Sequence, residues 1–273
     1  MHPIEEQVVL VTGATSGLGR QLVQRLAGVG ATVVAHGRDP QRLARTREGI
    51  CQATGQEVGT VQADLADLTQ VHGLADEVLE RYPRLHALVN NAGVGYGSSD
   101  AAREISSDGI ELRFAVNHLA SYLLARRLAH RLIESSPARI VQVASAGQQA
   151  LDPDDPFTEH GYDGVTAYRR SKLAQVMASF DLAADLVGTG VSVNAIHPAT
   201  FMDTAMVREA GQRPMSTVDD GVDAVWRLLT DPTLDAVSGH YFDGTKLAHP
   251  DPQADDPAAR AWLRHLSDSL ITR

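Results

Sequence analysis

The sequence places a phenol and an ammonium group one helical turn apart, at Tyr168 and Lys172. Residues at positions i and i+4 lie on the same face of a helix, with their Cβ atoms roughly 5–6 Å apart. A nearby cation favours the ionised form of a tyrosine, so we expect Lys172 to lower the pKa of Tyr168 from its usual value of about 10. Such a phenol could donate or accept a proton near neutral pH. The alternative is a surface tyrosine beside a solvated lysine on an amphipathic helix.

A glycine-rich turn, residues 12–19, lies between the first apolar run, Val8–Val11, and a segment with helical periodicity at residues 18–26. Glycines allow a tight turn and let backbone amides approach a pyrophosphate, while the N-terminus of a helix adds N–H donors and a partial positive charge. The alternative is a glycine-rich loop that binds nothing. We predict a dinucleotide site that includes Gly13, Thr15, Ser16, Gly17, Leu18 and Gly19.

The end of the second strand distinguishes NAD from NADP in sites of this kind. A carboxylate there binds the ribose 2′-hydroxyl, whereas an arginine accommodates the 2′-phosphate. Here Gly37 occupies the position of the carboxylate and Arg38 follows it. We therefore expect NADP(H), with NAD(H) as the alternative if Asp39 points inward. Asp64 and Leu65, after the third strand, are expected at the adenine; Asp64 could equally cap the next helix.

Short apolar runs alternate with longer amphipathic segments along the chain. Strands alternating with helices of 10–15 residues imply βαβ units and a parallel sheet covered on both faces. We expect the α/β class: a single Rossmann-type domain over residues 1–273, with a doubly wound parallel sheet of about seven strands flanked by helices. The expected strands are residues 8–11, 32–35, 58–61, 85–89, 140–144, 191–196 and 239–242. The expected helices are residues 18–26, a helix beginning at Pro40, 68–79, a long helix capped by Asp108, 166–186 and 218–229.

The composition excludes several classes of function. The formal net charge of −10 disfavours a nucleic-acid-binding surface and an anionic-membrane anchor. A single cysteine, Cys51, allows no internal disulfide and fits a reducing compartment. We find no secretory signal and no 18-residue apolar span, so we expect a cytoplasmic protein. No cluster of histidines and carboxylates has the spacing of metal ligands, and we expect no metal.

Two segments in the last third of the chain have expected roles. Residues 198–216 are predicted to form a mobile lid over the substrate, with an adaptable apolar face that includes Phe201, Met202, Met206 and Met215. The alternative is that these side chains only pack on the core. Trp262, Leu263 and Leu266 have helical spacing and predict a C-terminal helix over about residues 255–270.

Together these motifs resemble the classical short-chain dehydrogenase/reductase family, from Val8 to about Gly244. The resemblance is carried by the glycine turn, Asp64, Asn90-Asn91-Ala92-Gly93 after the fourth strand, Asn117, Ser145 and the Tyr168/Lys172 pair. Residues 114–119 and 171–174, and the 23-residue step from Ser145 to Tyr168, resemble the branch that includes retinol dehydrogenases and protochlorophyllide reductase. We do not see the membrane anchor of retinol dehydrogenases, so their substrate is not carried over.

The resemblance implies a role for each matched residue. Tyr168 would be the general acid/base, and Lys172 would lower its pKa and bind the nicotinamide ribose. Ser145 would hold the substrate oxygen, and Asn117 would steady a water in a proton relay to Lys172. Asn91, Ala92 and Gly93 would line the cofactor cleft. After the sixth strand the family usually has Pro-Gly and then a threonine. This chain has Pro198-Ala199-Thr200 and a later Thr204, so the threonine that meets the cofactor is left open.

The resulting hypothesis is an NADP(H)-dependent oxidoreductase that interconverts a carbonyl and a primary or secondary alcohol of a small molecule. One alternative is a non-catalytic dinucleotide-sensing regulatory protein on the same fold, because a fold alone does not determine function. Another is a reaction with transient hydride transfer, such as epimerisation. Family members often pair through their long helices, so a homodimer or homotetramer is left open.

Overall fold

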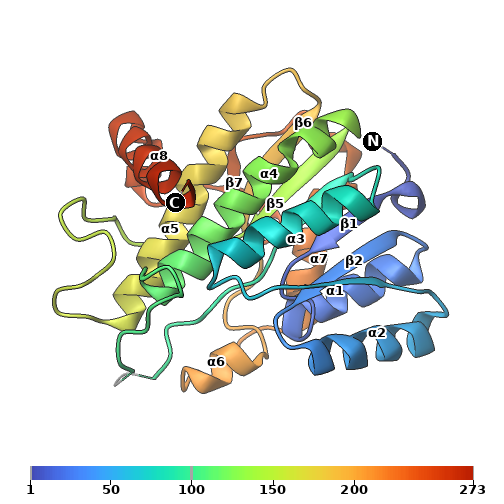
Figure 1. Cartoon of the computed structure of the whole chain (residues 1–273), viewed down its shortest axis with the longest axis horizontal. Coiled ribbons are helices and arrows are strands. Elements are labelled where there is room, and N and C mark those ends of the chain that lie inside the picture. Colours follow the sequence, from blue (N-terminus) through green and yellow to red (C-terminus); the bar gives the residue numbers. More distant parts are fainter. Residues whose placement is uncertain (1, 99–100, 273) are drawn as a thin grey trace.

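Seven parallel strands and one antiparallel strand form a single sheet in the order β3-β2-β1-β4-β5-β6-β7-β8 (Figure 1). The computed structural model describes residues 2–98 and 101–272. The strands are β1 (Val8–Val11), β2 (Thr32–Gly37), β3 (Gly59–Gln62), β4 (Ala87–Asn90), β5 (Ala138–Val143), β6 (Val191–His197), β7 (His240–Asp243) and β8 (Lys246–Ala248). The α/β class and the doubly wound sheet are as predicted, and β8 is the strand that the hydrophobic pattern did not indicate.

Helices cover both faces of the sheet (Figure 1). One face carries α1 (Gly17–Gly28), α2 (Pro40–Thr54) and α7 (Val218–Thr230), and the other carries α3 (Leu68–Arg81), α4 (Ala120–Glu134) and α5 (Gly164–Asp185). Outside these layers lie α6 (Ala205–Glu209) and α8 (Pro257–Ile271), and a π-helix (Phe114–Leu119) precedes α4. Three 3₁₀ turns complete the helical elements: Ile4–Glu6, Pro232–Leu234 and Pro252–Asp255.

Each central strand contributes to two separate hydrophobic cores. In β1, Val9 and Val11 pack toward α1 and α7, whereas Leu10 packs toward α3 and α4. Successive side chains of a strand point to opposite faces, so an all-apolar strand is what a sheet buried on both faces requires. The strand order reverses between β1 and β4. Open α/β sheets bind ligands at the carboxyl ends of the strands at such a switch point.

The expected long helix begins differently from the prediction. Asp108 does not cap it: its Oδ2 accepts a hydrogen bond from the Leu68 N–H at 3.0 Å, at the start of α3. Glu111 takes the capping role instead, because its Oε2 accepts from the Phe114 N–H at 2.8 Å. The chain then makes the π-helical turns before it continues as α4. Apolar periodicity locates this helix but does not reveal which carboxylate reaches its free N–H groups.

The C-terminal helix α8 packs across α4 and α5 (Figure 1). Tyr122 Oη of α4 donates to Asp268 Oδ1 at 2.7 Å, and Arg264 donates two hydrogen bonds to Asp185 of α5. His118 Nε2 lies 2.8 Å from Ser267 Oγ, with both side chains buried. The α8 helix is therefore held by polar contacts as well as by the apolar Leu263 and Leu270.

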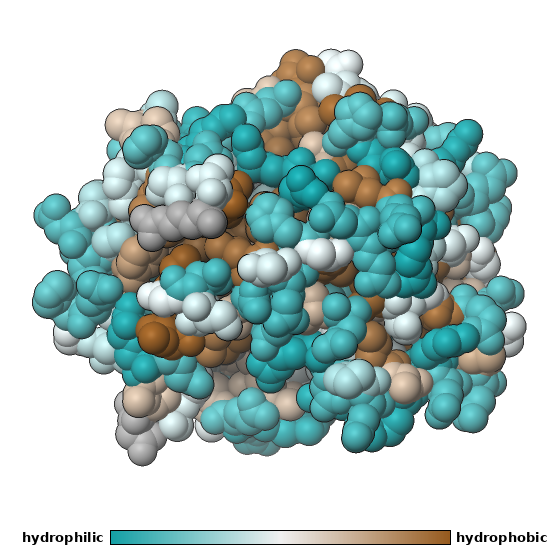
Figure 2. Space-filling view, viewed as in Figure 1, coloured by the Kyte–Doolittle hydropathy of each residue, from teal (hydrophilic) through white to brown (hydrophobic). Residues whose placement is uncertain are grey.

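The surface seen in Figure 2 is mostly hydrophilic, and its hydrophobic side chains gather in separate small patches. Within residues 2–98 and 101–272, no helix combines the length and apolarity needed to cross a bilayer.

We predict that His118 makes the stability of the fold depend on pH. Burial lowers the pKa of His118 to about 3, from an ordinary value of 6.5. Between these values the unfolded chain binds the extra proton, so this stabilisation is complete above pH 6.5 and is lost as the pH falls toward 3. From pH 6.5 to pH 5, wild type should lose about 2 kcal/mol of unfolding free energy relative to His118→Gln, at about 1.4 kcal/mol per pH unit. Urea unfolding at the two pH values measures this difference. Replacing the exposed His249 by Gln is the control, and an equal pH dependence in all three proteins would contradict the prediction.

Candidate active site

A cleft of about 900 Å³ lies at the carboxyl ends of the central strands. This volume is at the upper end of the range for small-molecule and cofactor sites, about 300–1,000 Å³. The predicted catalytic residues Ser145, Tyr168 and Lys172 line it. Every predicted cofactor residue lines it as well: Gly13, Thr15, Ser16, Gly17, Leu18, Gly19, Arg38, Asp64, Leu65, Asn91, Ala92, Gly93, Pro198 and Thr200. Asn117 is fully buried behind the cleft wall and does not face the cleft.

The glycine turn fits the diphosphate of a dinucleotide. Gly13 and Gly17 have positive φ values of +67° and +50°, which side-chain-bearing residues rarely adopt. A Cβ at Gly19 would lie 2.3 Å from Gly13 O, so the turn packs this closely only with glycine. The first N–H groups of α1 have no partners within the helix, and the Ser16 side chain makes no cap hydrogen bond. Donors and the positive end of the helix dipole are thus available to a diphosphate.

His36, which was not predicted as a site residue, holds the glycine turn in place. Its Nδ1 accepts a hydrogen bond from the Gly13 N–H at 3.3 Å, and its Nε2 lies 3.1 Å from Ala63 O. Burial lowers the pKa of His36 to about 4, so the ring is neutral at pH 7 and can accept at one nitrogen while donating at the other. A histidine within the otherwise apolar β2 was the available sequence signal.

Asp39, at the end of the cleft where we expect the adenosine, is the N-cap residue of α2. Its Oδ1 accepts from the Gln41 and Arg42 N–H groups at 2.8 and 3.0 Å, which caps α2. Asp64 does not cap α3, because Asp67 does so. Asp64 instead lies 3.8 Å from the exposed Arg38 guanidinium. Arg38 lines the cleft with its guanidinium largely exposed.

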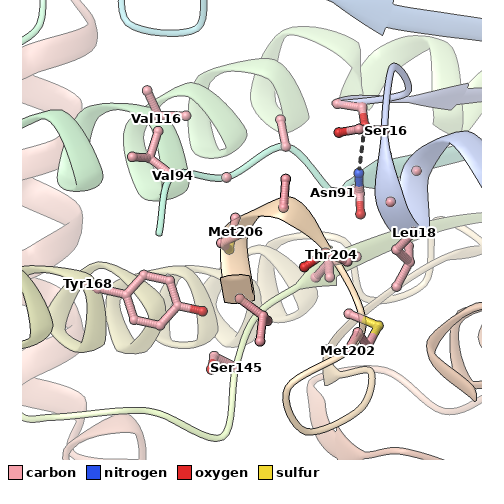
Figure 3. Close-up of a pocket in the computed structure, with 18 of the residues that line it drawn as sticks. Ser16, Leu18, Asn91, Val94, Val116, Ser145, Tyr168, Met202, Thr204 and Met206 are labelled. Atoms are coloured by element: carbon pink, nitrogen blue, oxygen red, sulfur yellow. Dashed lines mark hydrogen bonds between the residues drawn. The ribbon is translucent and has the colours of Figure 1, made fainter. Parts of the chain in front are cut away.

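Ser145 and Tyr168 face each other across the cleft, from the end of β5 and from α5 (Figure 3). Ser145 Oγ accepts a hydrogen bond from the Gly147 N–H at 3.0 Å, and the Ser145 hydroxyl is close enough to Tyr168 to influence its pKa. Asp163 caps α5 by accepting from the Thr166 N–H at 2.9 Å, which places Tyr168 near the start of that helix. The two hydroxyl groups can act together on one substrate oxygen.

The expectation that Lys172 lowers the pKa of Tyr168 is wrong in this structure. Burial raises the pKa of Tyr168, and the neighbouring Ser145 hydroxyl opposes this rise only in part. The Lys172 ammonium is directed elsewhere: it donates to Val143 O at 2.8 Å and to Gln175 Oε1 at 3.0 Å. Burial also lowers the pKa of Lys172 to about 7, because the charged form is desolvated.

Asn117 connects the segment after β4 to α5. Its Oδ1 accepts from the Val94 N–H at 2.7 Å, and its Nδ2 donates to Val94 O at 3.1 Å and to Ser171 Oγ at 2.9 Å. It lies in the π-helix, a rare conformation that is frequent at functional sites. In this structure the Asn117 side chain supports the cleft wall and the helix that carries Tyr168.

The predicted lid, residues 198–216, lies over the cleft (Figure 3). Met206 of α6 reaches Gly95 on one side, and Thr204 reaches Gly17 on the other. Thr200 Oγ1 lies 3.1 Å from His197 Nε2. Thr204, which was left outside the predicted set, is thus the threonine that contacts the glycine turn. Met202 packs against Gly221, whereas Met215 is 72% exposed.

Two buried amides extend the hydrogen bonding of Lys172 into the core. Gln175 Oε1 accepts from Lys172 Nζ, and Gln175 Nε2 donates to Gln142 Oε1 of β5 at 3.2 Å. Both glutamines are nearly inaccessible. Gln175 lies one helical turn beyond Lys172, but the sequence alone did not indicate that it is buried.

Among the described residues, no group of three or more His, Cys, Asp or Glu side chains could hold a metal ion.

Fold and cleft together define an enzyme that binds a nicotinamide dinucleotide and acts on an alcohol or carbonyl group. A family model described as short chain dehydrogenase matches residues 7–214, and the chain belongs to this family, whose members interconvert CH–OH and C=O groups. Retinol dehydrogenase 14 of Mus musculus is 33% identical, over 97% of this chain and 86% of its own length. The resemblance to the retinol dehydrogenase branch is therefore confirmed.

Solved structures include similar proteins that hold a nicotinamide cofactor. A protein of Escherichia coli CFT073, complexed with NADPH, is 27% identical with a TM-score of 0.73, covering 88% of this chain and 97% of that one. The 3-ketoacyl-(acyl-carrier-protein) reductase of Brucella melitensis, complexed with NADH, is 25% identical with a TM-score of 0.71 and covers the same shares.

We predict that Gln175→Leu destabilises the protein. The change leaves the Lys172 ammonium and the Gln142 amide each without one buried partner, which costs about 1–3 kcal/mol per unsatisfied group. Chemical denaturation should report this loss. The matched control is Gln24→Leu at an exposed position of α1, where the change should be within about 0.5 kcal/mol of wild type. Equal stabilities of the two variants would show that the amide pair is not needed.

Proposed function

We propose that this protein is an NADP(H)-dependent oxidoreductase that interconverts a carbonyl compound and its primary or secondary alcohol, with Tyr168 as the general acid/base. The observation that carries the proposal is that Ser145 and Tyr168 face the same cleft, with the buried Lys172 one helical turn from Tyr168. A protein that only senses a dinucleotide has no need of these proton-transfer groups.

The proposed chemistry divides between the cofactor and the chain. A bound nicotinamide cofactor supplies or accepts the hydride. During reduction, negative charge develops on the substrate oxygen, and donors placed beside that oxygen stabilise the charge. Ser145 and Tyr168 provide two such hydroxyl groups. Because burial raises the pKa of Tyr168, the phenol stays protonated at neutral pH and is a proton donor in the direction of reduction.

Lys172 is the group that can exchange a proton behind Tyr168. Its pKa of about 7 allows both protonation states near neutral pH. Gln175 and Val143 fix the position of its Nζ atom. We assign Lys172 to the cofactor ribose, as the family resemblance implies, and also to proton exchange with Tyr168.

The preference for NADP(H) rests on Arg38. Asp39 is held at the start of α2, and Gly37 offers no carboxylate to a ribose 2′-hydroxyl. A Cβ at Gly37 would lie 2.5 Å from Thr15 Cγ2, so a larger residue fits poorly there. An exposed guanidinium beside this gap suits a 2′-phosphate.

The substrate end of the cleft favours an uncharged, lipophilic carbonyl compound. Its lining includes Leu112, Val116, Val165 and Met206. Such side chains gain free energy by covering apolar substrate surface.

Replacing Tyr168 by Phe should lower kcat by about 10²–10⁴-fold, the usual range for general acid/base catalysis. Binding of NADPH should persist, because only one hydroxyl is removed. NADPH oxidation with a panel of ketones and aldehydes, and NADPH fluorescence titration, measure the two effects. Tyr122→Phe removes a hydroxyl that bonds Asp268 outside the cleft and is the matched control. Full activity of Tyr168→Phe would refute the assignment.

Replacing Arg38 by Ala should raise the KM for NADPH by about 10–100-fold, because hydrogen bonds to charged groups contribute roughly 1.5–3 kcal/mol each. The KM for NADH should change little, since NADH has no 2′-phosphate. Steady-state kinetics with both cofactors measure the effect. Arg45→Ala, on the exposed surface of α2, is the control. Equal effects of Arg38→Ala on both cofactors would remove the case for NADP(H).

A further inference from the structure

Tyr96 lies in the cleft beside the proposed catalytic tyrosine. The two rings meet edge to face, with their centroids 5.7 Å apart and their planes at 73°. A substrate whose carbonyl oxygen meets Tyr168 therefore has the Tyr96 ring as a neighbour. Val94, Leu112 and Val116 also line the cleft, and the Tyr96 side chain is bulkier than each of them.

The backbone beneath Tyr96 is held by side chains from two positions four residues apart. Arg113 Nε donates to Gly95 O at 2.9 Å, and Arg113 Nη2 donates to Tyr96 O at 3.2 Å. Asn117 makes two further hydrogen bonds to Val94. Four hydrogen bonds therefore fix the backbone of three consecutive residues, 94–96.

The start of α5 confines the same segment from the other side. A Cβ at Gly164 would lie 2.3 Å from Tyr96 O, so the chain passes this helix at a distance that only glycine permits. Met206 of the lid segment contacts Gly95, where a Cβ would lie 2.7 Å from Met206 Cγ. The backbone of Gly95 and Tyr96 therefore lies between the start of α5 and Met206 of the lid segment.

Arg113 is itself part of a buried charged cluster. Arg113 and Glu111 are each 1% exposed, and their side chains pair at 3.2 Å. Arg113 Nη1 also donates to Tyr162 Oη at 2.6 Å, and Tyr162 Oη donates to Glu111 Oε1 at 3.3 Å. Burying a charged pair is costly unless its remaining hydrogen bonds are satisfied. Here two of those hydrogen bonds go to the backbone that carries Tyr96.

We propose that Tyr96 sets the size of the substituent that the enzyme accepts next to the substrate carbonyl, and that Arg113 is the positioning residue that holds Tyr96 against Tyr168. The substrate class is a lipophilic ketone with a flat apolar substituent, and we expect Tyr96 to favour a substituent of one ring over a fused two-ring substituent. This inference rests on the proposed function, because it places the substrate carbonyl at Tyr168.

The test compares acetophenone with 2-acetonaphthone, which differ by one fused ring. In Tyr96→Ala, the ratio of kcat/KM for 2-acetonaphthone to that for acetophenone should rise at least about tenfold over wild type, the discrimination that a hydrophobic pocket typically gives. Tyr96→Phe keeps the ring and should keep the wild-type ratio. Tyr82→Ala is the matched control, because Tyr82 follows α3, lies next to Gly59 of β3 and does not line the cleft. An unchanged ratio in Tyr96→Ala overturns the proposal, and so does a Tyr96→Phe ratio equal to that of Tyr96→Ala.

Arg113 is tested by Arg113→Met and by the charge-balanced double variant Glu111→Gln/Arg113→Met, which leaves no unpaired buried carboxylate if the single variant does not fold. Either folded variant should shift the substrate ratio in the direction of Tyr96→Ala, through a lower KM for 2-acetonaphthone with little change in kcat. A uniform fall in kcat for both ketones would indicate a merely structural role and would overturn the assignment of Arg113.

Binding measurements separate failure of this inference from failure of the proposed function. The Kd values of the two ketones for the protein loaded with NADP⁺ are measured by calorimetry in wild type and Tyr96→Ala. Absence of turnover in wild type counts against the proposed function alone. In that case a Kd ratio that shifts about tenfold in Tyr96→Ala supports the role of Tyr96, and an unchanged Kd ratio overturns it.

Discussion

The cleft depends on a hydrogen-bonded junction between the carboxyl ends of β1 and β4. Thr12 Oγ1 accepts from the Asn91 and Ala92 N–H groups at 2.9 and 3.0 Å, and Asn91 Nδ2 donates to Thr12 O at 2.8 Å and to Gly13 O at 3.2 Å. Ala92 Cα would lie only 2.8 Å from a Cβ at Gly13. The glycine turn and the segment after β4 are therefore one unit. A change at either side of this junction alters both the glycine turn and the wall that leads to Tyr96.

Sequence analysis predicted those features whose causes are local. Glycines at positions that require positive φ, such as Gly13, mark a turn that other residues rarely adopt. Apolar runs such as Val8–Val11 mark strands buried on both faces, and the spacing of Tyr168 and Lys172 places both on one helix face. The order of these motifs was enough to predict the α/β class, the parallel sheet and many of the residues that line the cleft.

The remaining features depend on contacts between distant positions. Neither the contact of Arg113 with Tyr162 nor that of Gln175 with Gln142 follows from residue spacing, because each pair meets only when separate elements pack. The pKa of Tyr168 failed as a prediction for the same reason. The spacing along the helix places Lys172 near Tyr168 but does not show which acceptors bind its ammonium group. Burial then has the largest effect on the pKa of Tyr168.

The position of α8 restricts which surfaces of the molecule are free to associate. Arg260 and Arg264 of α8 form ion pairs with Asp181 and Asp185 of α5, and Asp268 accepts a hydrogen bond from Tyr122 of α4. A second copy of the chain that approached the part of α5 next to Asp181 and Asp185 would contact α8 there. Association through that part of α5 would require the displacement of α8 and the loss of its ion pairs.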